Sequence, residues 1–440
     1  MSNKISEIIK TLSQRDVEAL KSIYSYRCLT ANQIYELHYN KSLRGNEEIS
    51  DTYCKKKIAE LISLNLIEKV EYADIEVFFL TPLGIEVIRY CFDLPTNIYD
   101  AKRKVVKRGY YRASELKISG KYISHQVQTN QFLIDFQALK PDFYWKYFDE
   151  KYISQFTNIR PDGLLSMFDI DFFIEMDMAT ESKKQLLDKW MNYRNFLNSR
   201  EYQYSEKKIV VLFIIEGTDK KEARIDLVKH TINEGILDKM DSNFEIFVDT
   251  KENILKMLQE RYFSMLNNSN KFLNKAKDLL NNKYEFQIAS GEKIKELFNN
   301  TEYWAYCRKK NPNGNNIIVE NGKVQEYIFD LYHFSPMSVI KKIAYLDSNN
   351  VFFKSKFNRE ISYVIIGEKE TQLYHDLKVL DLLVINNVYF TTLDRMEKLP
   401  FHEALFQFDF LGNIHHFTDS GLKERCFECN ISELQQWWEN

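Results

Sequence analysis

Three carboxylates in the middle of the chain have the residue types and spacing of a divalent-cation site. Asp162 precedes a run in which Glu175 and Asp177 lie two residues apart. If residues 163–177 are extended, the alternation of side chains puts Glu175 and Asp177 on one face of the strand. We expect Asp162 to lie opposite them on an adjoining strand. Because Mg²⁺ prefers oxygen ligands and keeps several waters, two or three such carboxylates suffice to hold it.

The chemistry that such a site would support is phosphodiester hydrolysis. A bound metal neutralises the charge that develops on the phosphate and helps to activate water. An ammonium beside the metal would add to this effect, and Lys184 and Lys189 lie on the predicted helix that follows. Tyr193 lies four residues after Lys189 on the same helix face. The alternative is a structural role, in which paired lysines or arginines hold buried carboxylates.

Residues 121–262 alternate between helical and extended patterns, which predicts an α/β core that positions these side chains. The expected elements are a helix at 124–138, extended runs at 143–158 and 163–177, a helix at 181–197, a strand at 208–215, a helix at 220–235 and a strand at 244–249. On the first helix, His125, Gln126 and Asn130 are candidates for positioning a phosphate or for hydrogen bonding to the carboxylates. The alternative is that they are ordinary structural residues.

Residues 1–95 have the order of a winged-helix DNA-binding domain, with three helices followed by a hairpin. Helical spacing covers 15–26, Thr30 caps a second helix, and Ser50 and Asp51 open a third. In this architecture the third helix enters the major groove of DNA. The expected DNA contacts are Arg44, Lys55, Lys56 and Lys57. The alternative is a wing domain that binds protein instead of DNA.

Residues 96–120 form a predicted basic linker. Between 102 and 117, seven basic residues accompany one acid, Glu115, so the local charge is seven minus one, or +6. We expect five of the basic residues to follow a phosphate backbone: Lys102, Arg103, Lys104, Lys107 and Arg108. Tyr110 and Tyr111 in the same run would stack on exposed bases. The alternative is a solvated linker between domains.

Four of these runs together resemble the replication-relaxation family. They are His125–Asn130 (HQVQTN), Arg160–Asp162 (RPD), Phe173–Ser182 (FIEMDMATES) and Lys189–Tyr193 (KWMNY), and the resemblance covers about residues 10–235. That family occurs on plasmids and integrative elements and pairs an N-terminal winged helix with a core similar to PD-(D/E)XK restriction endonucleases. The resemblance implies binding at an origin, with a role in replication or in relaxation of origin DNA. Some relatives look like mobilisation proteins.

The chain departs from the nuclease pattern at one position. Asp177 stands where the (D/E)XK element has its lysine. The resemblance therefore implies Asp162 and Glu175 as metal ligands, Asp177 as a third ligand or a group that orients water, and Lys189 as a displaced cation. If no lysine reaches that place, the core is a DNA-binding or structural relative of the nucleases.

Residues 263–440 are predicted to form an α+β region. A helix followed by a hairpin-like strand, centred on Leu373–Thr392, has the outline of a second winged helix, and an α+β interaction domain fits as well. Near the C-terminus, His415, Cys426 and Cys429 have the residue types of a tetrahedral zinc site. Because one Cys-x-x-Cys without a second is a weak signal, we favour a free CFEC segment over zinc.

The composition is that of a folded multidomain protein of mixed α/β and α+β class. The 440 residues are 44% apolar and 28% charged, and the net charge of −3 gives no direction by itself. The longest apolar run, 209–215, is far short of the ~20 residues that span a bilayer. Six scattered cysteines do not make a disulfide framework, so we expect a cytoplasmic protein without membrane contact.

Three functions fit these patterns. The first is a DNA-processing protein at a plasmid or mobile-element origin, which nicks or remodels DNA with Mg²⁺. The second is a non-catalytic DNA-binding initiator or regulator, and the third is a defence-type nuclease. Whether the chain is an enzyme stays open. The expected partner is double-stranded DNA, and a homodimer and replication or mobilisation proteins are further candidates.

Overall fold

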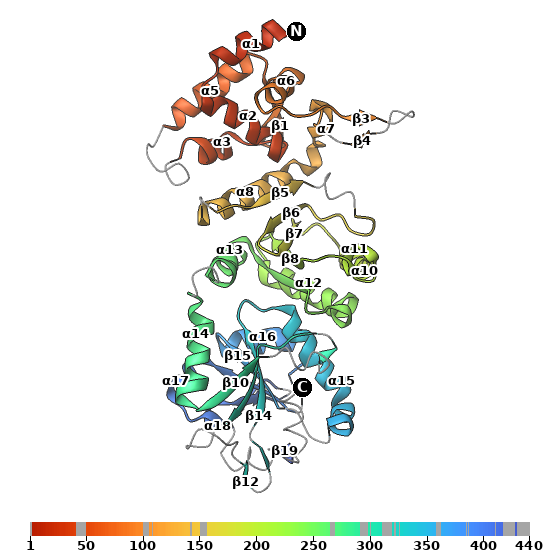
Figure 1. Cartoon of the computed structure of the whole chain (residues 1–440), viewed down its shortest axis with the longest axis vertical. Helices are drawn as coiled ribbons and strands as arrows, with labels where there is room; N and C mark the ends of the chain where they lie inside the picture. The colour runs from red at the N-terminus through yellow and green to blue at the C-terminus, as the bar shows by residue number, and fades with distance from the viewer. Residues whose placement is uncertain are drawn as a thin grey trace. The chain divides into compact units, whose positions relative to one another are not determined.

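The computed structural model shows a mixed α/β chain with several sheets, among them sheets of two, five and seven strands (Figure 1). The structure describes residues 2–40, 50–99, 105–107, 109–140, 143–149, 156–264, 269–290, 298–299, 301–309, 319–320, 323–324, 326–357, 362–383, 385, 387–409, 411–416 and 427–428. Two compact units are present. Unit 1 comprises Met1–Ile153, Pro161–Leu165 and Met176–Met178, and unit 2 comprises Ser154–Arg160, Ser166–Glu175 and Ala179–Asn440. The domain boundaries expected at 95, 120 and 262 stay predictions.

The N-terminal part of unit 1 has the predicted order of helices and hairpin. Its elements are α1 (Ser2–Thr11), α2 (Gln14–Tyr26), α3 (Ala31–His38), α5 (Asp51–Ser63), β1 (Ile67–Tyr72), β2 (Ile75–Leu80) and α6 (Pro82–Cys91). Ser13 and Thr30 begin α2 and α3 with capping boxes, which satisfy backbone N–H groups of the first turn. Ala73 and Asp74 both have positive φ, so the two-residue turn fits the right-handed twist of the hairpin.

The rest of unit 1 contains a long helix and short strands. These are β3 (Ile98–Tyr99), β4 (Val105–Lys107), α7 (Ala113–Leu116), the 3-10 turn η1 (Gly120–Tyr122), α8 (Ile123–Leu139) and β5 (Lys146–Asp149). The helix expected at 124–138 is thus confirmed as α8. The extended run expected at 143–158 is a strand over β5, and its residues 150–155 lie outside the described residues.

The run expected as one strand at 163–177 is a hairpin of two strands, β6 (Gly163–Met167) and β7 (Ile170–Asp177). The turn lies at Phe168 and Asp169, where Phe168 has a φ of 52°. A bulky residue seldom adopts positive φ, so the sequence carries little sign of this turn. The two strands belong to a five-stranded sheet of order β5-β6-β7-β8-β9, with β8 (Lys208–Ile215) parallel to β9 (Phe244–Thr250).

Helices of unit 2 follow β7 and β8 in the alternation that the sequence predicts. They are α10 (Lys183–Leu197), α11 (Arg200–Gln203), α12 (Lys221–Gly235), the 3-10 turn η2 (Leu237–Lys239), α13 (Lys251–Met257) and the π-helical turn η3 (Leu258–Tyr262). Helices α10 and α12 pack together, and the Trp190 indole N–H donates to Thr231 Oγ1 at 3.0 Å. Because β8 is buried from Ile209 onward, its continuous apolar run is that of a strand with both faces covered.

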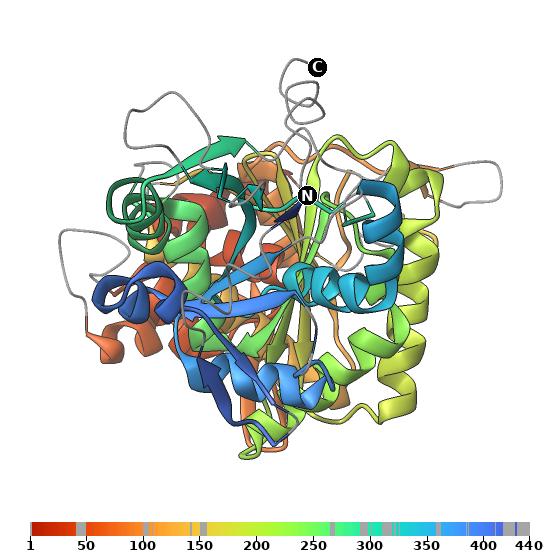
Figure 2. The same ribbon diagram turned by 90° about the horizontal axis from the view of Figure 1, so that it is seen from below.

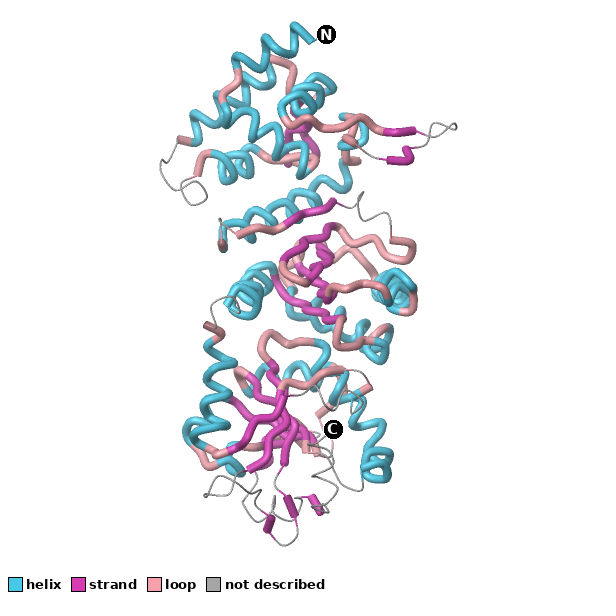
Figure 3. The backbone as a smooth tube through the Cα atoms, viewed as in Figure 1, coloured by secondary structure: helices cyan, strands magenta, loops and turns pink. Residues whose placement is uncertain are grey.

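The C-terminal part of unit 2 is built on a seven-stranded sheet of order β10-β11-β14-β15-β16-β17-β18 (Figure 3). Its strands are β10 (Phe286–Ser290), β11 (Ala305–Lys309), β14 (Glu326–Tyr332), β15 (Tyr363–Gly367), β16 (Val388–Thr392), β17 (Phe406–Phe408) and β18 (Ile414–His416). Strands β14, β15 and β16 are parallel, and the outer strands pair antiparallel. A small sheet joins β12 (Val319–Glu320), β13 (Lys323–Val324) and β19 (Phe427–Glu428).

Helices cover both faces of the seven-stranded sheet. They are α14 (Lys271–Asp278) with the π-helical turn η5 (Leu279–Lys283), α15 (Met337–Phe357), α16 (Glu370–Val379), α17 (Leu393–Lys398) and α18 (Phe401–Ala404). Figures 1 and 2 show α14 and α15 on opposite sides of the sheet. The segment expected as a second winged helix is α16 and β16, and β16 pairs parallel with β15. The strand is therefore part of this large sheet and not of a separate two-stranded wing, which fits the alternative of an α+β domain better than a second winged helix.

None of the helices in the described part of the chain is long and apolar enough to span a membrane.

Candidate functional site

Strand β7 carries both of its predicted carboxylates into the protein interior. The side chains alternate as expected, with Ile174 and Met176 in the core. Glu175 and Asp177 are each only 3% exposed, so the strand is buried on both faces. An ionised carboxylate at such a position is costly unless protein groups pair with it. The partners of these carboxylates therefore decide what the strand can do.

Glu175 is held by two side chains of helix α10. Lys189 Nζ lies 2.9 Å from Glu175 Oε2, and the Tyr193 hydroxyl donates to Oε1 at 2.6 Å. Ser182 caps α10, and the four-residue spacing of Lys189 and Tyr193 puts both on the face that meets β7. Lys189 also lies 3.3 Å from Glu181 Oε1. Of the two candidate lysines, Lys189 is thus the one that pairs with Glu175, whereas Lys184 is exposed.

Asp162 in unit 1 accepts a hydrogen bond from the backbone of β7. The Met176 N–H donates to Asp162 Oδ2 at 2.7 Å. His125 Nε2 lies 2.9 Å from Met176 O and 3.2 Å from the same Oδ2. Since a carbonyl and a carboxylate both only accept, Nε2 of His125 must carry a proton. The expectation that Asp162 lies opposite β7, with His125 holding it by a hydrogen bond, agrees with this placement.

Gly163 follows Asp162 and opens β6 where space is limited. A Cβ at this position would lie 2.8 Å from Cε2 of Tyr147. Only glycine allows the chain to pass the Tyr147 ring at this distance. The glycine therefore marks a close approach of the backbone to the Tyr147 ring beside Asp162.

Two more buried carboxylates described in unit 2 are, like Glu175, each bound by a lysine and a tyrosine. Asp330 binds Lys342 and Tyr363, each at 2.5 Å from its Oδ2. Asp376 binds Lys229 at 2.6 Å, Tyr332 at 2.9 Å and Ser335 at 2.7 Å. Burial and the neighbouring carboxylates raise the pKa values of Tyr332 and Tyr363, so both phenols stay protonated and donate.

Among the described residues of unit 2, the Glu175–Lys189–Tyr193 group is therefore one of three triads that each join a lysine, a tyrosine and a buried carboxylate. Sequence reasoning missed the other two, because their partners are up to 147 residues apart and no local spacing records them. The repetition of this arrangement bears on function. It shows that unit 2 compensates buried carboxylates by placing a lysine at hydrogen-bond distance, whether or not a site is catalytic. The Glu175–Lys189 pair alone does not identify a catalytic centre.

The donor types fit Mg²⁺, but the described residues do not assemble a metal centre. Among the parts of the chain that the structure describes, no group of three or more His, Cys, Asp or Glu side chains could hold a metal ion. Both oxygens of Glu175 and one oxygen of Asp162 are engaged by protein hydrogen bonds. A metal at Glu175 would have to displace Lys189.

Asn130 and Gln126 of α8 serve the packing of unit 1. Asn130 is fully buried, and its Nδ2 donates to Tyr26 O at 3.2 Å and to Cys28 O at 2.6 Å. Gln126 in turn donates to Asn130 Oδ1 at 2.9 Å. The geometry thus favours a structural role for Asn130 and Gln126 over a role in positioning a phosphate.

Comparison with known proteins identifies part of the chain. Residues 20–212, from α2 into β8, match the family model described as replication-relaxation. These residues are similar to the replication-relaxation family. The resemblance carried by the motifs from His125 to Tyr193 is confirmed over this range. A search of curated proteins and a search of solved structures each found no match.

The lysines of helix α5 lie in the replication-relaxation region and differ in their surroundings. Lys55 pairs with Asp51 at 2.6 Å, and Lys57 is drawn toward Glu60 at 2.8 Å. Lys56 is exposed and has no ion pair among the described residues. Of the three lysines expected to contact DNA from this helix, Lys56 is therefore the one whose charge no described carboxylate balances. Arg44, the fourth expected contact, lies outside the described residues.

The basic linker of the replication-relaxation region is only partly described. Lys102, Arg103, Lys104 and Arg108 lie outside the described residues, as does the side chain of Lys107. The two tyrosines of the run pack within unit 1. The Arg89 guanidinium lies 4.1 Å from the centre of the Tyr110 ring, and the Tyr111 hydroxyl donates to Asp149 at 3.2 Å. These rings are therefore engaged, so base stacking by Tyr110 and Tyr111 loses its support.

The expected zinc ligands lie beyond the replication-relaxation region. His415 is in β18, and its Nε2 is 3.5 Å from Asp409 Oδ2 with the side chain 64% exposed. Cys426 and Cys429 fall outside the described residues. Zinc binding thus stays without structural support.

Proposed function

We propose that this chain is a DNA-binding protein that acts at the origin of a plasmid or mobile element, in replication or in relaxation of origin DNA. The observation that carries the proposal is the replication-relaxation match over residues 20–212. That range includes α2, α3, α5 and the β1–β2 hairpin, whose order is that of a winged helix. Double-stranded DNA is the partner that this order favours.

In this proposal, helix α5 is the element that enters the major groove. Lys56 makes the leading phosphate or base contact, because it is exposed and pairs with no carboxylate in the part of the chain that the structure describes. Lys55 contributes after it leaves Asp51, an exposed pair that costs little to break. Lys57 contributes least, since Glu60 and the nearly buried Asp16 attract it. Arg44 and the linker residues Lys102, Arg103, Lys104, Lys107 and Arg108 are proposed as further backbone contacts.

A second candidate function is metal-dependent nicking by a core similar to PD-(D/E)XK nucleases. Its support is the placement of an acid and an ammonium 2.9 Å apart, at Glu175 and Lys189, inside the family region. The resemblance to that core implies Asp162, Glu175 and Asp177 as ligands of Mg²⁺ and Lys189 as the cation, but a metal at Glu175 would displace Lys189 from its present pairing. The recurrence of the same triad at Asp330 and Asp376 favours the non-catalytic initiator or regulator.

One experiment separates these functions. The full chain is incubated with supercoiled plasmid that carries the DNA flanking its own gene, with Mg²⁺ or Mn²⁺, beside Asp162→Ala and Glu175→Gln variants. Preferential binding to the flanking DNA without conversion supports the non-catalytic initiator. Open circles that both variants fail to produce support nicking, and linear products without site preference point to a defence-type nuclease. Equal binding to unrelated DNA, or none, contradicts an origin-specific role.

A further inference from the structure

Unit 2 contains a cavity of about 400 Å³ that none of the motifs above explains. It is lined by the first residue of β8, the start of β9, the end of η3, α14, the end of β14 and α15. Every lining residue belongs to the described part of unit 2. Its volume lies within the range of small-molecule sites in proteins, about 300–1,000 Å³.

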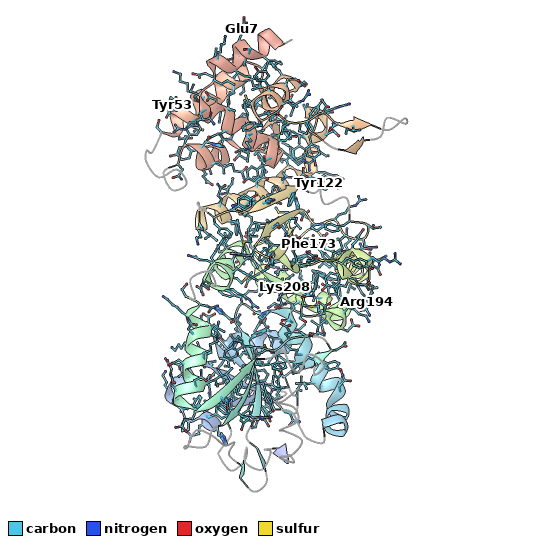
Figure 4. All side chains as sticks on the ribbon, viewed as in Figure 1. Glu7, Tyr53, Tyr122, Phe173, Arg194 and Lys208 are labelled. Carbon is cyan, nitrogen blue, oxygen red and sulfur yellow. The ribbon has the colours of Figure 1, made fainter. Side chains whose placement is uncertain are left out.

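Two cations that line the cavity have no carboxylate partner. Lys208 and Arg261 form no ion pair among the described residues, although both are partly buried. Arg261 lies over the Phe247 ring, 5.1 Å from its centre. Burial and the nearby cations Arg261 and Lys342 lower the pKa of Lys208, and the nearby Glu245 and Glu302 partly oppose this effect. A partly desolvated charge without a partner is unfavourable, so an anion bound between these groups would be held strongly. Lys208 is labelled in Figure 4.

Three of the acids that line the cavity are already satisfied by the protein. Asp330 binds Lys342 and Tyr363. Glu245 accepts from the backbone N–H of Ser338 at 3.0 Å, at the start of α15, and from the Ser338 hydroxyl. Asp241 accepts from the Tyr202 hydroxyl and from the Asn243 N–H. The remaining acid, Glu302, is exposed. Among the described residues, none of these four acids forms an ion pair with Lys208 or Arg261, so both cations remain open to a ligand anion.

The cavity also has aromatic walls and an unused hydrogen-bonding group. Phe272 and His333 stack with their ring centres 4.5 Å apart, and Trp304 lines the same space. Tyr303 is 5% exposed and lines the cavity. Its buried hydroxyl has no hydrogen-bond partner among the described residues. A buried polar group left unpaired is rare in folded proteins and indicates a missing partner.

We propose that this cavity binds a mononucleotide, with its phosphate at Lys208 and Arg261 and its base against Phe272 and Trp304. The cation pair supplies charge-assisted hydrogen bonds to phosphate oxygens, which are among the stronger polar contacts in proteins. Aromatic faces accept any base by stacking. This inference concerns unit 2 alone and does not depend on DNA binding by unit 1.

The test is calorimetric titration of the full chain with the four ribonucleoside 5′-monophosphates and with inorganic phosphate. At least one nucleotide is expected to bind, and more tightly than phosphate alone. Lys208→Met and Arg261→Gln should each weaken that binding at least about tenfold. Lys220→Gln, an exposed lysine at the start of α12 in the same unit, is the matched control and should change nothing.

Folding does not confound this test, because Lys208→Met removes an unpaired charge. The ligand-free variant should be at least as stable as the parent in thermal unfolding, while losing the rise in Tm that the nucleotide gives. No binding of any nucleotide at about 1 mM overturns the proposal, since a weaker site has no specific contacts. It also fails if the Lys208→Met and Arg261→Gln proteins bind as tightly as the control, or if phosphate alone binds as tightly as every nucleotide.

Discussion

Lys189 Nζ lies 2.9 Å from Glu175 Oε2 and joins helix α10 to strand β7 through a carboxylate that is almost fully buried. The same motif pairs Lys342 with Asp330 and Lys229 with Asp376. Each pair compensates a charge that burial alone would make costly. Because the three pairs have the same geometry, the loss of stability on breaking either of the other two can be compared with the loss on breaking Lys189–Glu175. This comparison separates a structural role of Glu175 from a catalytic one.

Replacing Lys189 should destabilise the fold whether or not the core cleaves DNA. In Lys189→Met, Glu175 keeps Tyr193 but loses its counter-charge, which should lower the free energy of unfolding by about 3–5 kcal/mol. Urea unfolding measures this loss, with the exposed Lys184→Met as the control, expected within about 0.5 kcal/mol of the parent. Lys229→Met should lose a similar amount. Equal stability of the Lys189 and Lys184 variants would show that the pair carries no structural role.

Lys56 should matter more for DNA affinity than its neighbours on α5. Lys56→Gln removes the exposed lysine of α5 that pairs with no described acid, so the slope of log K against log salt should fall by about one. Lys57→Gln should change the slope less, because Glu60 already competes for that ammonium. Fluorescence anisotropy at several salt concentrations measures both slopes. The major-groove placement of α5 is wrong if the Lys56→Gln slope equals that of the parent.

Asn130 should be a structural residue of unit 1. Asn130→Leu leaves the carbonyls of Tyr26 and Cys28 without their buried donor, which should cost about 1–3 kcal/mol per lost partner. Chemical denaturation compares it with Asn32→Ala, an exposed asparagine whose bond is to Glu36. We expect the Asn32 variant to match the parent within about 0.5 kcal/mol. A phosphate-positioning role would instead appear as weaker DNA binding at unchanged stability.

His333 should make unit 2 less stable in mild acid. Burial and the nearby cations Arg261 and Lys256 lower the pKa of His333 to about 4. Between pH 6.5 and about pH 4, this histidine is protonated in the unfolded chain, where its pKa is about 6.5, but neutral in the folded protein. The stability that neutral His333 contributes is therefore complete above pH 6.5 and is lost as the pH falls toward 4.

The expected size of this effect is about 2 kcal/mol between pH 7.5 and pH 5. Glu260 and Glu368 lie 3.5 and 3.9 Å from Nε2 of His333 and oppose the shift, so this figure is an upper value. Urea unfolding at the two pH values measures it, and His333→Gln should remove that share of the pH dependence. His375→Gln, at an exposed histidine paired with Asp226, is the control. An unchanged pH dependence in His333→Gln would mean that folding does not shift the pKa of His333.

Local sequence patterns determined the elements of this protein and part of its candidate site. Cap residues such as Ser13 and Thr30, and the apolar spacing behind them, predict α2 and α3, because backbone hydrogen bonding within one helix depends on neighbouring residues. The same holds for Lys189 and Tyr193, whose spacing places them on one face of α10. The motifs from His125 to Tyr193 also identify the family region.

Tertiary structure alone decided which groups meet. Nothing local to Asn130 records that its amide serves Tyr26 and Cys28, about a hundred residues earlier, and nothing local to Asp376 records Lys229. The positive φ of Phe168 splits an apparent single strand without glycine or proline to mark it. An unpaired charge is costly to bury, so buried charged groups need partners. Those partners are residues that packing brings close in space, and the periodicity of the sequence does not indicate which residues they are.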